Sequence, residues 1–307
     1  MNRLRTQVRD YLRLRRALGY KLVEHERFLN QYLAYLEQTG ATTITQENAL
    51  TWACLPVDTT PRWHAARLGA VRGFACWAHT FDPTVQVPPT GQLSLRPTRS
   101  TPYLYSDKEI DALMHAAGAL VPGFRASTYQ TAIGLLTVTG MRPGEVVRLN
   151  VDDLDLDDAL LTVRNTKFGK SRLLPLHPST IEALRGYLRQ RATRTATTPA
   201  LLISVAGTRL TYDVVFRTFR KLCSRNGLEP RSSACRPRLH DLRHTFAVNT
   251  LIDAYRTDTD PNERLPLLST YLGHAEPANT YWYLHASPEL LTLAAQRLST
   301  HREGTLS

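Results

Sequence analysis

Three short motifs near the C-terminal end of this 307-residue chain combine residues that could act on a phosphate. They are His240-Asp241-Leu242-Arg243-His244-Thr245, Leu272-Gly273-His274 and Thr280-Tyr281-Trp282-Tyr283. Arginine is a fixed cation that can bind phosphate through two parallel hydrogen bonds, and histidine can move a proton near neutral pH. Tyrosine can act as a covalent nucleophile when its phenolate is stabilised. These residue types indicate phosphoryl transfer without a metal.

His240 and His244 are four residues apart, so they lie on one face of a predicted helix. This spacing is also that of zinc peptidases, but Asp241 stands where their motif has glutamate. Arg243 would place a fixed cation beside the metal. A metal site is therefore disfavoured, although each histidine taken alone could be a packing residue.

A further cation lies upstream in the segment Thr139-Gly140-Met141-Arg142-Pro143-Gly144-Glu145. Gly140 permits a sharp turn, and Pro143 suits the first turn of a helix. Arg142 would then sit at a helix N-terminus, where free backbone N–H groups favour an anion. Glu145 could hold the turn or pair with an arginine.

A β-hairpin is predicted next, with strands at residues 160–164 and 171–176 and with Lys167 and Lys170 at its tip. A lysine in a turn is usually only solvated, so this feature gains weight only beside the others. Two capping boxes predict helix starts, at Ser106-x-x-Glu109 and Ser179-x-x-Glu182. The acidic stretch between Thr245 and Leu272 predicts a surface loop, and Pro288 opens a C-terminal helix.

The composition favours a polyanionic partner. The formal net charge is +11 and the pI is about 9.7, while a hydrophobic content of 42% is enough for sizeable cores. The four cysteines form no Cys-x-x-Cys pair, which indicates reduced thiols. No apolar run reaches membrane-spanning length and no signal peptide is visible, so we expect a cytoplasmic protein without a membrane partner.

The length of the chain and a proline-rich linker predict two domains. Residues 1–97 form amphipathic helices and carry twelve Lys and Arg against seven Asp and Glu. Their basic face could contact DNA phosphates or could simply be solvated. The proline-rich stretch at 82–102 predicts an extended linker. Residues 98–307 form the second domain, so the fold class is mainly α with a small β-hairpin or sheet.

In this order, the motifs resemble those of the tyrosine recombinase (phage integrase) family over essentially the whole chain. The matching pieces are the segment 139–145, the hairpin lysine, His240-x-Leu242-Arg243-His244-Thr245, Leu272-Gly273-His274 and Tyr283. The resemblance implies an N-terminal SAM-like core-binding domain at 1–97. It also implies an α+β catalytic domain at 98–307 and a C-shaped clamp on DNA.

The resemblance also implies a role for each site residue. Arg142 and Arg243 would clamp the scissile phosphate, and Lys167, or Lys170 as the alternative, would protonate the leaving 5′-hydroxyl. His240 would assist proton transfer at the tyrosine, and His274 would hydrogen-bond the phosphate. Tyr283 fits the family's Thr-x-x-Tyr-x-His pattern and is the expected nucleophile, whereas Tyr281 lies two residues away from that position.

The implied function is site-specific DNA recombination, in integration or transposition, by a phage- or transposon-borne or Xer-like enzyme. It would proceed through a 3′-phosphotyrosine intermediate and a Holliday junction, without cofactor or metal. Its partners would be double-stranded DNA with inverted-repeat sites, further copies of the chain and accessory recombinases. The copies would form a dimer on a site and a tetramer in the synapse through the C-terminal helix. The alternatives are a type IB topoisomerase-like enzyme and a non-catalytic DNA-binding protein of the same fold.

Overall fold

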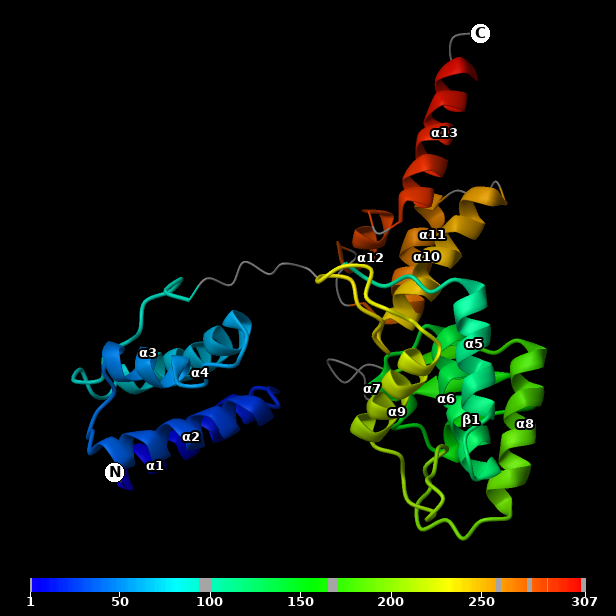
Figure 1. Cartoon of the computed structure of the whole chain (residues 1–307). Helices are drawn as coiled ribbons and strands as arrows, with labels where there is room; N and C mark the ends of the chain where they lie inside the picture. Colours follow the sequence, from blue (N-terminus) through cyan, green and yellow to red (C-terminus); the bar gives the residue numbers. More distant parts are fainter. Residues whose placement is uncertain are drawn as a thin grey trace. The chain divides into compact units, whose positions relative to one another are not determined.

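The chain folds into two compact units, Met1–Arg99 and Ser100–Ser307 (Figure 1). The computed structural model describes residues 2–93, 101–164, 171–257, 261–274, 278–285 and 287–304. Lys167 and Lys170, predicted at the tip of the hairpin, lie outside the described residues. Within the described part of the chain, no helix is both long and apolar enough to cross a membrane.

The first unit is a bundle of helices around its own apolar core. The helices are α1 (Asn2–Ala17), α2 (Val23–Thr39), α3 (Gln46–Cys54) and α4 (Pro61–His79). Thr45 caps α3 by accepting from the backbone N–H of Asn48, and α2 ends at Gly40 with a positive φ of 69°. Tyr32, Leu33, Phe74 and other apolar side chains of these helices form one buried cluster. This unit is therefore all-helical, as its periodicity predicts.

The second unit combines helices with a small sheet. Its longer helices are α5 (Asp107–Gly118), α6 (Gly123–Thr139), α8 (Pro178–Ala192), α9 (Tyr212–Arg225), α10 (Asp241–Arg256), α11 (Pro261–Leu272) and α13 (Pro288–Gly304). The short elements are α7 (Pro143–Val146), η1 (Val151–Asp153), α12 (Ala278–Tyr281) and η3 (Trp282–His285). Figure 1 shows α10, α11 and α13 gathered at one end of this unit, with α5, α6 and α8 at the other.

The sheet is antiparallel, with strands in the order β1 (Leu154–Asp155), β2 (Leu160–Val163) and β3 (Arg172–Pro175). Leu161 pairs with Leu174, and both are fully buried, so their shared face packs on the core. The predicted hairpin is thus present, and a short third strand is added to it. A mainly α fold with a small antiparallel sheet confirms the predicted fold class.

Two local predictions are wrong. The helix predicted from Ser179 begins instead at Pro178, with His177 accepting from the backbone N–H of Ser179. The proline takes the first helical position because its fixed φ suits that position, and this moves the cap two residues earlier. The acidic stretch predicted as a loop is largely helical, in α10 and α11. Its described acidic residues, Asp253 and Glu263, are exposed on these helices, whereas Asp258 and Asp260 lie outside the described residues.

A second apolar cluster in this unit surrounds the predicted nucleophile. Val248 and Leu251 of α10, Leu268 and Leu272 of α11 and Tyr283 of η3 are buried together. The element that carries Tyr283 is therefore held by packing against the helices that carry two of the histidine motifs.

Candidate active site

Arg142 is positioned by the turn after α6. Gly140 adopts a positive φ of 58°, and an added Cβ there would lie 2.4 Å from Cδ1 of Phe246. Only glycine fits this close approach without strain. Arg142 then serves as the N-cap residue of α7, with Pro143 in the first turn. The predicted turn and helix start are both present.

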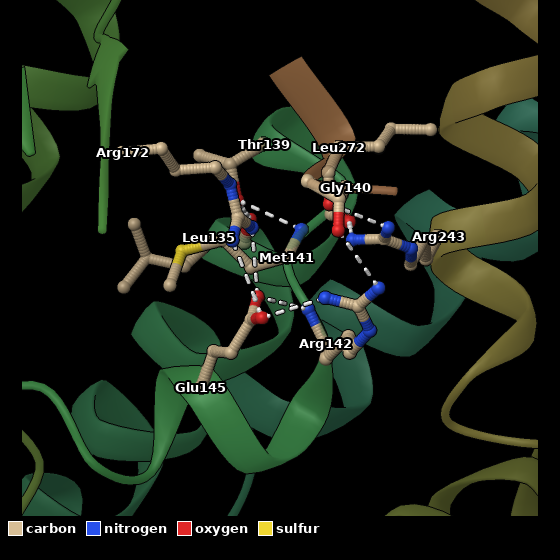
Figure 2. A network of polar contacts seen from close by, with 10 residues as sticks. Leu135, Thr139, Gly140, Met141, Arg142, Glu145, Arg172, Arg243 and Leu272 are labelled. Atoms are coloured by element: carbon tan, nitrogen blue, oxygen red, sulfur yellow. Dashed lines mark hydrogen bonds and ion pairs between the residues drawn. The ribbon is translucent and has the colours of Figure 1, made fainter. Parts of the chain in front are cut away.

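Glu145 joins Arg142 to the sheet (Figure 2). Its carboxylate accepts from the backbone N–H of Arg142 at 3.0 Å and from Nη1 of Arg142 at 2.9 Å. It also accepts from Nη2 of Arg172 at 2.8 Å and Nη1 of Arg172 at 3.3 Å. Burial alone would raise the pKa of Glu145, but these hydrogen bonds and charges lower it to about 2. Glu145 is therefore a carboxylate at neutral pH, and it both holds the turn and pairs with arginines.

Arg243 is almost completely buried, with 1% of its surface exposed. Its Nη1 donates to the carbonyl of Gly140 at 2.8 Å and its Nη2 to the carbonyl of Leu272 at 2.7 Å. Figure 2 shows its guanidinium beside that of Arg142, whose Nη2 donates to the carbonyl of Gly273 at 3.4 Å. Burial, followed by the charge of Arg142, lowers the pKa of Arg243 to about 10, so it stays charged.

The predicted histidines lie around Tyr283. The ring centroid of His274 is 6.0 Å from that of Tyr283, and its Nδ1 lies 2.7 Å from the hydroxyl of Thr280. The His244 ring is 5.4 Å from Tyr283 and 5.0 Å from His240. These contacts bring the three motifs near the C-terminal end into one cluster.

All three imidazoles are neutral at pH 7. Burial first, and neighbouring cations second, lower the pKa of His240 and of His274 to about 4. Burial and the neighbouring His240 lower that of His244 to about 3. The surface of His240 is exposed, unlike those of His244 and His274, so solvent screens its shift most and the neutral form is least strongly favoured there. A neutral imidazole can accept a proton, which a protonated one cannot.

Tyr283 is buried, with 2% of its surface exposed. Burial raises the pKa of its phenol, while the charge of Arg243 and a hydrogen bond with that guanidinium lower it. Tyr281, the sequence neighbour, is 53% exposed. Tyr271 stacks on Phe246 with ring centroids 5.6 Å apart. Of these tyrosines, Tyr283 is the one that lies among the arginines and histidines.

Hydrogen bonds of Asp241 and Thr245 stabilise the start of α10. Asp241 is fully buried and accepts from Arg238 at 2.7 and 2.9 Å. The hydroxyl of Thr245 donates to the carbonyl of Asp241 and accepts from the backbone N–H of Tyr105 at 3.0 Å. Asp241, which distinguishes the motif from that of a zinc peptidase, is thus a structural carboxylate here. In the described part of the chain, no group of three or more His, Cys, Asp and Glu could hold a metal ion.

Five of the six predicted site residues converge, namely Arg142, His240, Arg243, His274 and Tyr283. The sixth, Lys167, lies outside the described residues, so the choice between it and Lys170 stays a prediction. Sequence reasoning missed Arg172, which shares Glu145 with Arg142. The only signal in the sequence was its place near the start of the predicted returning strand.

Comparison with known proteins identifies the family that this chain matches. Residues 104–289 match the model of the phage integrase family. The chain is 45% identical to y4rB of Sinorhizobium fredii, a protein named for an integrase/recombinase, over 99% of both chains. It is 26% identical to the tyrosine recombinase XerD of Lacticaseibacillus casei, over 96% of this chain and 97% of that one.

A solved structure shows the same fold at lower identity. The Tn1549 transposon integrase in complex with transposon right-end DNA superposes with a TM-score of 0.66 at 16% identity. The match covers 95% of this chain and 99% of that chain. With the family match and the full-length relative, the conclusion is that this chain belongs to the phage integrase family of tyrosine recombinases.

Proposed function

We propose that this chain is a site-specific recombinase that cuts and rejoins DNA strands through Tyr283. The observation that carries the proposal is the pairing of Tyr283 with Arg243, a phenol beside a guanidinium in one buried site. Among the described residues, Arg243 is held by two backbone carbonyls and forms no ion pair with a carboxylate. Its charge is therefore available both to a phenolate and to a phosphate.

The cleavage step exchanges one phosphodiester bond for another. The Tyr283 oxygen attacks the phosphorus, a bond from that oxygen to phosphorus forms, and the bond to the 5′-oxygen breaks. The phenol proton passes to the neutral His240, and Lys167 protonates the departing 5′-oxygen. The product is a 3′-phosphotyrosine and a free 5′-hydroxyl. Attack by the 5′-hydroxyl of another strand reverses the step and leads to a Holliday junction.

Charge stabilisation supplies most of the catalysis in such a reaction. Arg142 and Arg243 would face the non-bridging oxygens, whose negative charge grows in the transition state. Arg142 keeps 29% of its side chain exposed, which leaves it accessible to DNA. His274, fixed by Thr280 at Nδ1, has its other ring nitrogen left for a phosphate oxygen.

Double-stranded DNA with inverted-repeat sites is the proposed partner. The net charge of +11 favours a polyanion, and the solved Tn1549 integrase is a complex with transposon DNA. We further propose that α13 joins copies of the chain into a dimer on one site and a tetramer in the synapse. Accessory recombinases belong to the same proposal.

The test uses a nicked duplex that carries the cognate site, incubated with the protein in EDTA. Wild type should form a covalent protein–DNA adduct, and Tyr283→Phe should form none because it lacks the nucleophilic oxygen. Tyr281→Phe is the matched control and should form the adduct at close to the wild-type rate. An adduct that survives Tyr283→Phe, or that requires Mg²⁺, would contradict the mechanism.

Two further assays separate the alternatives. A type IB topoisomerase-like enzyme would relax supercoiled plasmids that lack any recombination site. A non-catalytic DNA-binding protein would retard the duplex in a gel without forming any adduct.

A further inference from the structure

The site contains a third guanidinium besides those of Arg142 and Arg243. Arg172, the first residue of β3, has 11% of its side chain exposed and binds the buried Glu145 through both terminal nitrogens. The same carboxylate also accepts from Arg142. Glu145 is therefore one negative charge shared between two arginines, rather than half of a simple pair.

Arg172 also touches the loop that leads to His274. Gly273 has a positive φ of 68°, and an added Cβ there would lie 3.1 Å from Nη1 of Arg172. The charge of Arg172 is close enough to contribute to the lowered pKa of His274 and of Arg243. Arg172 thus lies where the turn before α7, the sheet and the His274 loop meet.

The net charge of this cluster of arginines and Glu145 determines how well Arg142 can bind a phosphate. Three arginines and one carboxylate leave two net positive charges, which can stabilise the negative charge that develops on the phosphate oxygens in the transition state. Without Arg172, the Glu145 carboxylate would pair with Arg142 alone. One net positive charge would remain, and Arg142 would be drawn toward Glu145 and away from the phosphate.

We propose that Arg172 is a positioning residue for phosphate binding: by sharing Glu145, it lets this carboxylate orient Arg142 without neutralising it. The proposal rests on the proposed function for its catalytic consequence. Its electrostatic content concerns phosphate binding alone, so it can be tested without any reaction.

The test compares Arg172→Gln with the double variant Arg172→Gln/Glu145→Gln. The single variant should cleave the nicked duplex about 10²-fold more slowly, the scale of losing one stabilising group for a developing oxyanion. The double variant restores two net positive charges and should cleave roughly tenfold faster than the single variant. A rate difference of this size lies within the interaction free energies found between residues of one network. A purely structural role predicts that the double variant is as slow as the single one, or slower.

Arg164→Gln is the matched control. Arg164 lies just after β2, at the same end of the hairpin as Arg172, because its neighbour Val163 pairs with Arg172 in the sheet. It pairs with Asp153 at 2.6 Å while 61% of its side chain is exposed. This variant should cleave at close to the wild-type rate. An equal loss of cleavage rate in Arg164→Gln and Arg172→Gln would overturn the proposal, because the effect would then follow from the loss of any ion pair of the hairpin.

A second readout uses inorganic phosphate. Phosphate should raise the thermal midpoint of wild type and of the double variant, and should raise that of Arg172→Gln much less. If wild type forms no adduct but the phosphate shifts follow this order, the proposed function fails and the role of Arg172 stands. If wild type forms the adduct and Arg172→Gln matches it in rate and in phosphate shift, the role of Arg172 fails alone.

Discussion

The three histidines around Tyr283 differ from solvated histidines because each is held neutral at physiological pH. Burial and neighbouring cations lower the pKa values of His240 and His274 to about 4 and that of His244 to about 3. The phenol that we propose as the nucleophile thus has neutral imidazoles near it. Because these imidazoles are neutral, they add no positive charge beside the arginines.

His244 should make stability depend on pH. Its pKa is about 3 in the folded chain against an ordinary 6.5, so between these values the unfolded chain binds a proton that the folded chain does not. Stability is therefore intact above pH 6.5 and falls as the pH drops toward 3. His244→Gln should reduce the loss in unfolding free energy between pH 7 and pH 5 by about 1 kcal/mol or more.

Urea denaturation at the two pH values measures this change. The exposed His25 provides the control, and His25→Gln should leave the pH dependence close to that of wild type. An unchanged pH dependence in His244→Gln would show that this imidazole titrates as freely in the folded chain as in the unfolded one.

At the scale of elements, the sequence predicts local features better than long-range ones. The turn at Gly140, the helix start at Pro143 and the hairpin follow from backbone preferences of a few neighbouring residues, and all three are present. The contact of Arg172 with Glu145 joins residues 27 positions apart, and no local preference encodes it.

The two wrong predictions have the same origin. The Ser179 cap pattern lost to Pro178, because both patterns fit the segment and the fixed φ of proline suits the first helical position. Asp253 and Glu263 are exposed on helices, and composition alone does not distinguish an acidic helix face from a loop. Convergence of Arg142, Arg243 and Tyr283 likewise required knowledge of the fold, which here came from the resemblance.

Gly140→Ala should be far more costly than an ordinary glycine replacement. The substitution would strain a positive φ and would place Cβ 2.4 Å from Phe246 and 3.1 Å from Leu272. We expect a loss in unfolding free energy of about 2 kcal/mol or more, as for other strained or overpacked core sites. Adduct formation should fall as well, since the turn sets the place of Arg142.

Gly227→Ala is the control for the backbone part of this effect. Gly227 has a similar φ of 64° but no atom within 4 Å of an added Cβ. Its replacement should cost about 1 kcal/mol, from the left-handed conformation alone, and should leave adduct formation unchanged. Equal losses in the two variants would mean that the contact with Phe246 does not matter.

At the scale of the whole molecule, the described apolar clusters of the two units share no residue. The first cluster runs from Leu4 to Val85, and the clusters of the second unit lie between Tyr103 and Leu290. Each unit thus has the means to fold as a separate body.

Leu33→Ala tests this separation. Leu33 is 1% exposed in the first unit, and its truncation should cost about 2–5 kcal/mol there. Three of the four tryptophans, Trp52, Trp63 and Trp77, belong to that unit, so fluorescence reports mainly on its unfolding. The fluorescence midpoint should fall, while a second transition in far-ultraviolet circular dichroism should keep the wild-type midpoint. A joint shift of both transitions would indicate a single cooperative body.

The hydrogen bonds of Arg243 to the backbone determine how easily this residue could be lost in evolution. Its guanidinium satisfies the carbonyls of Gly140 and Leu272, at the ends of α6 and α11, so its loss would leave two helix ends without partners in a buried place. Tyr283→Phe, by contrast, removes one hydroxyl and keeps the ring in its apolar cluster. A lineage that abandoned catalysis but kept DNA binding would therefore be expected to lose the Tyr283 hydroxyl early and to keep Arg243 longest. In such a descendant, Arg243 would remain after the hydroxyl of the proposed nucleophile had gone.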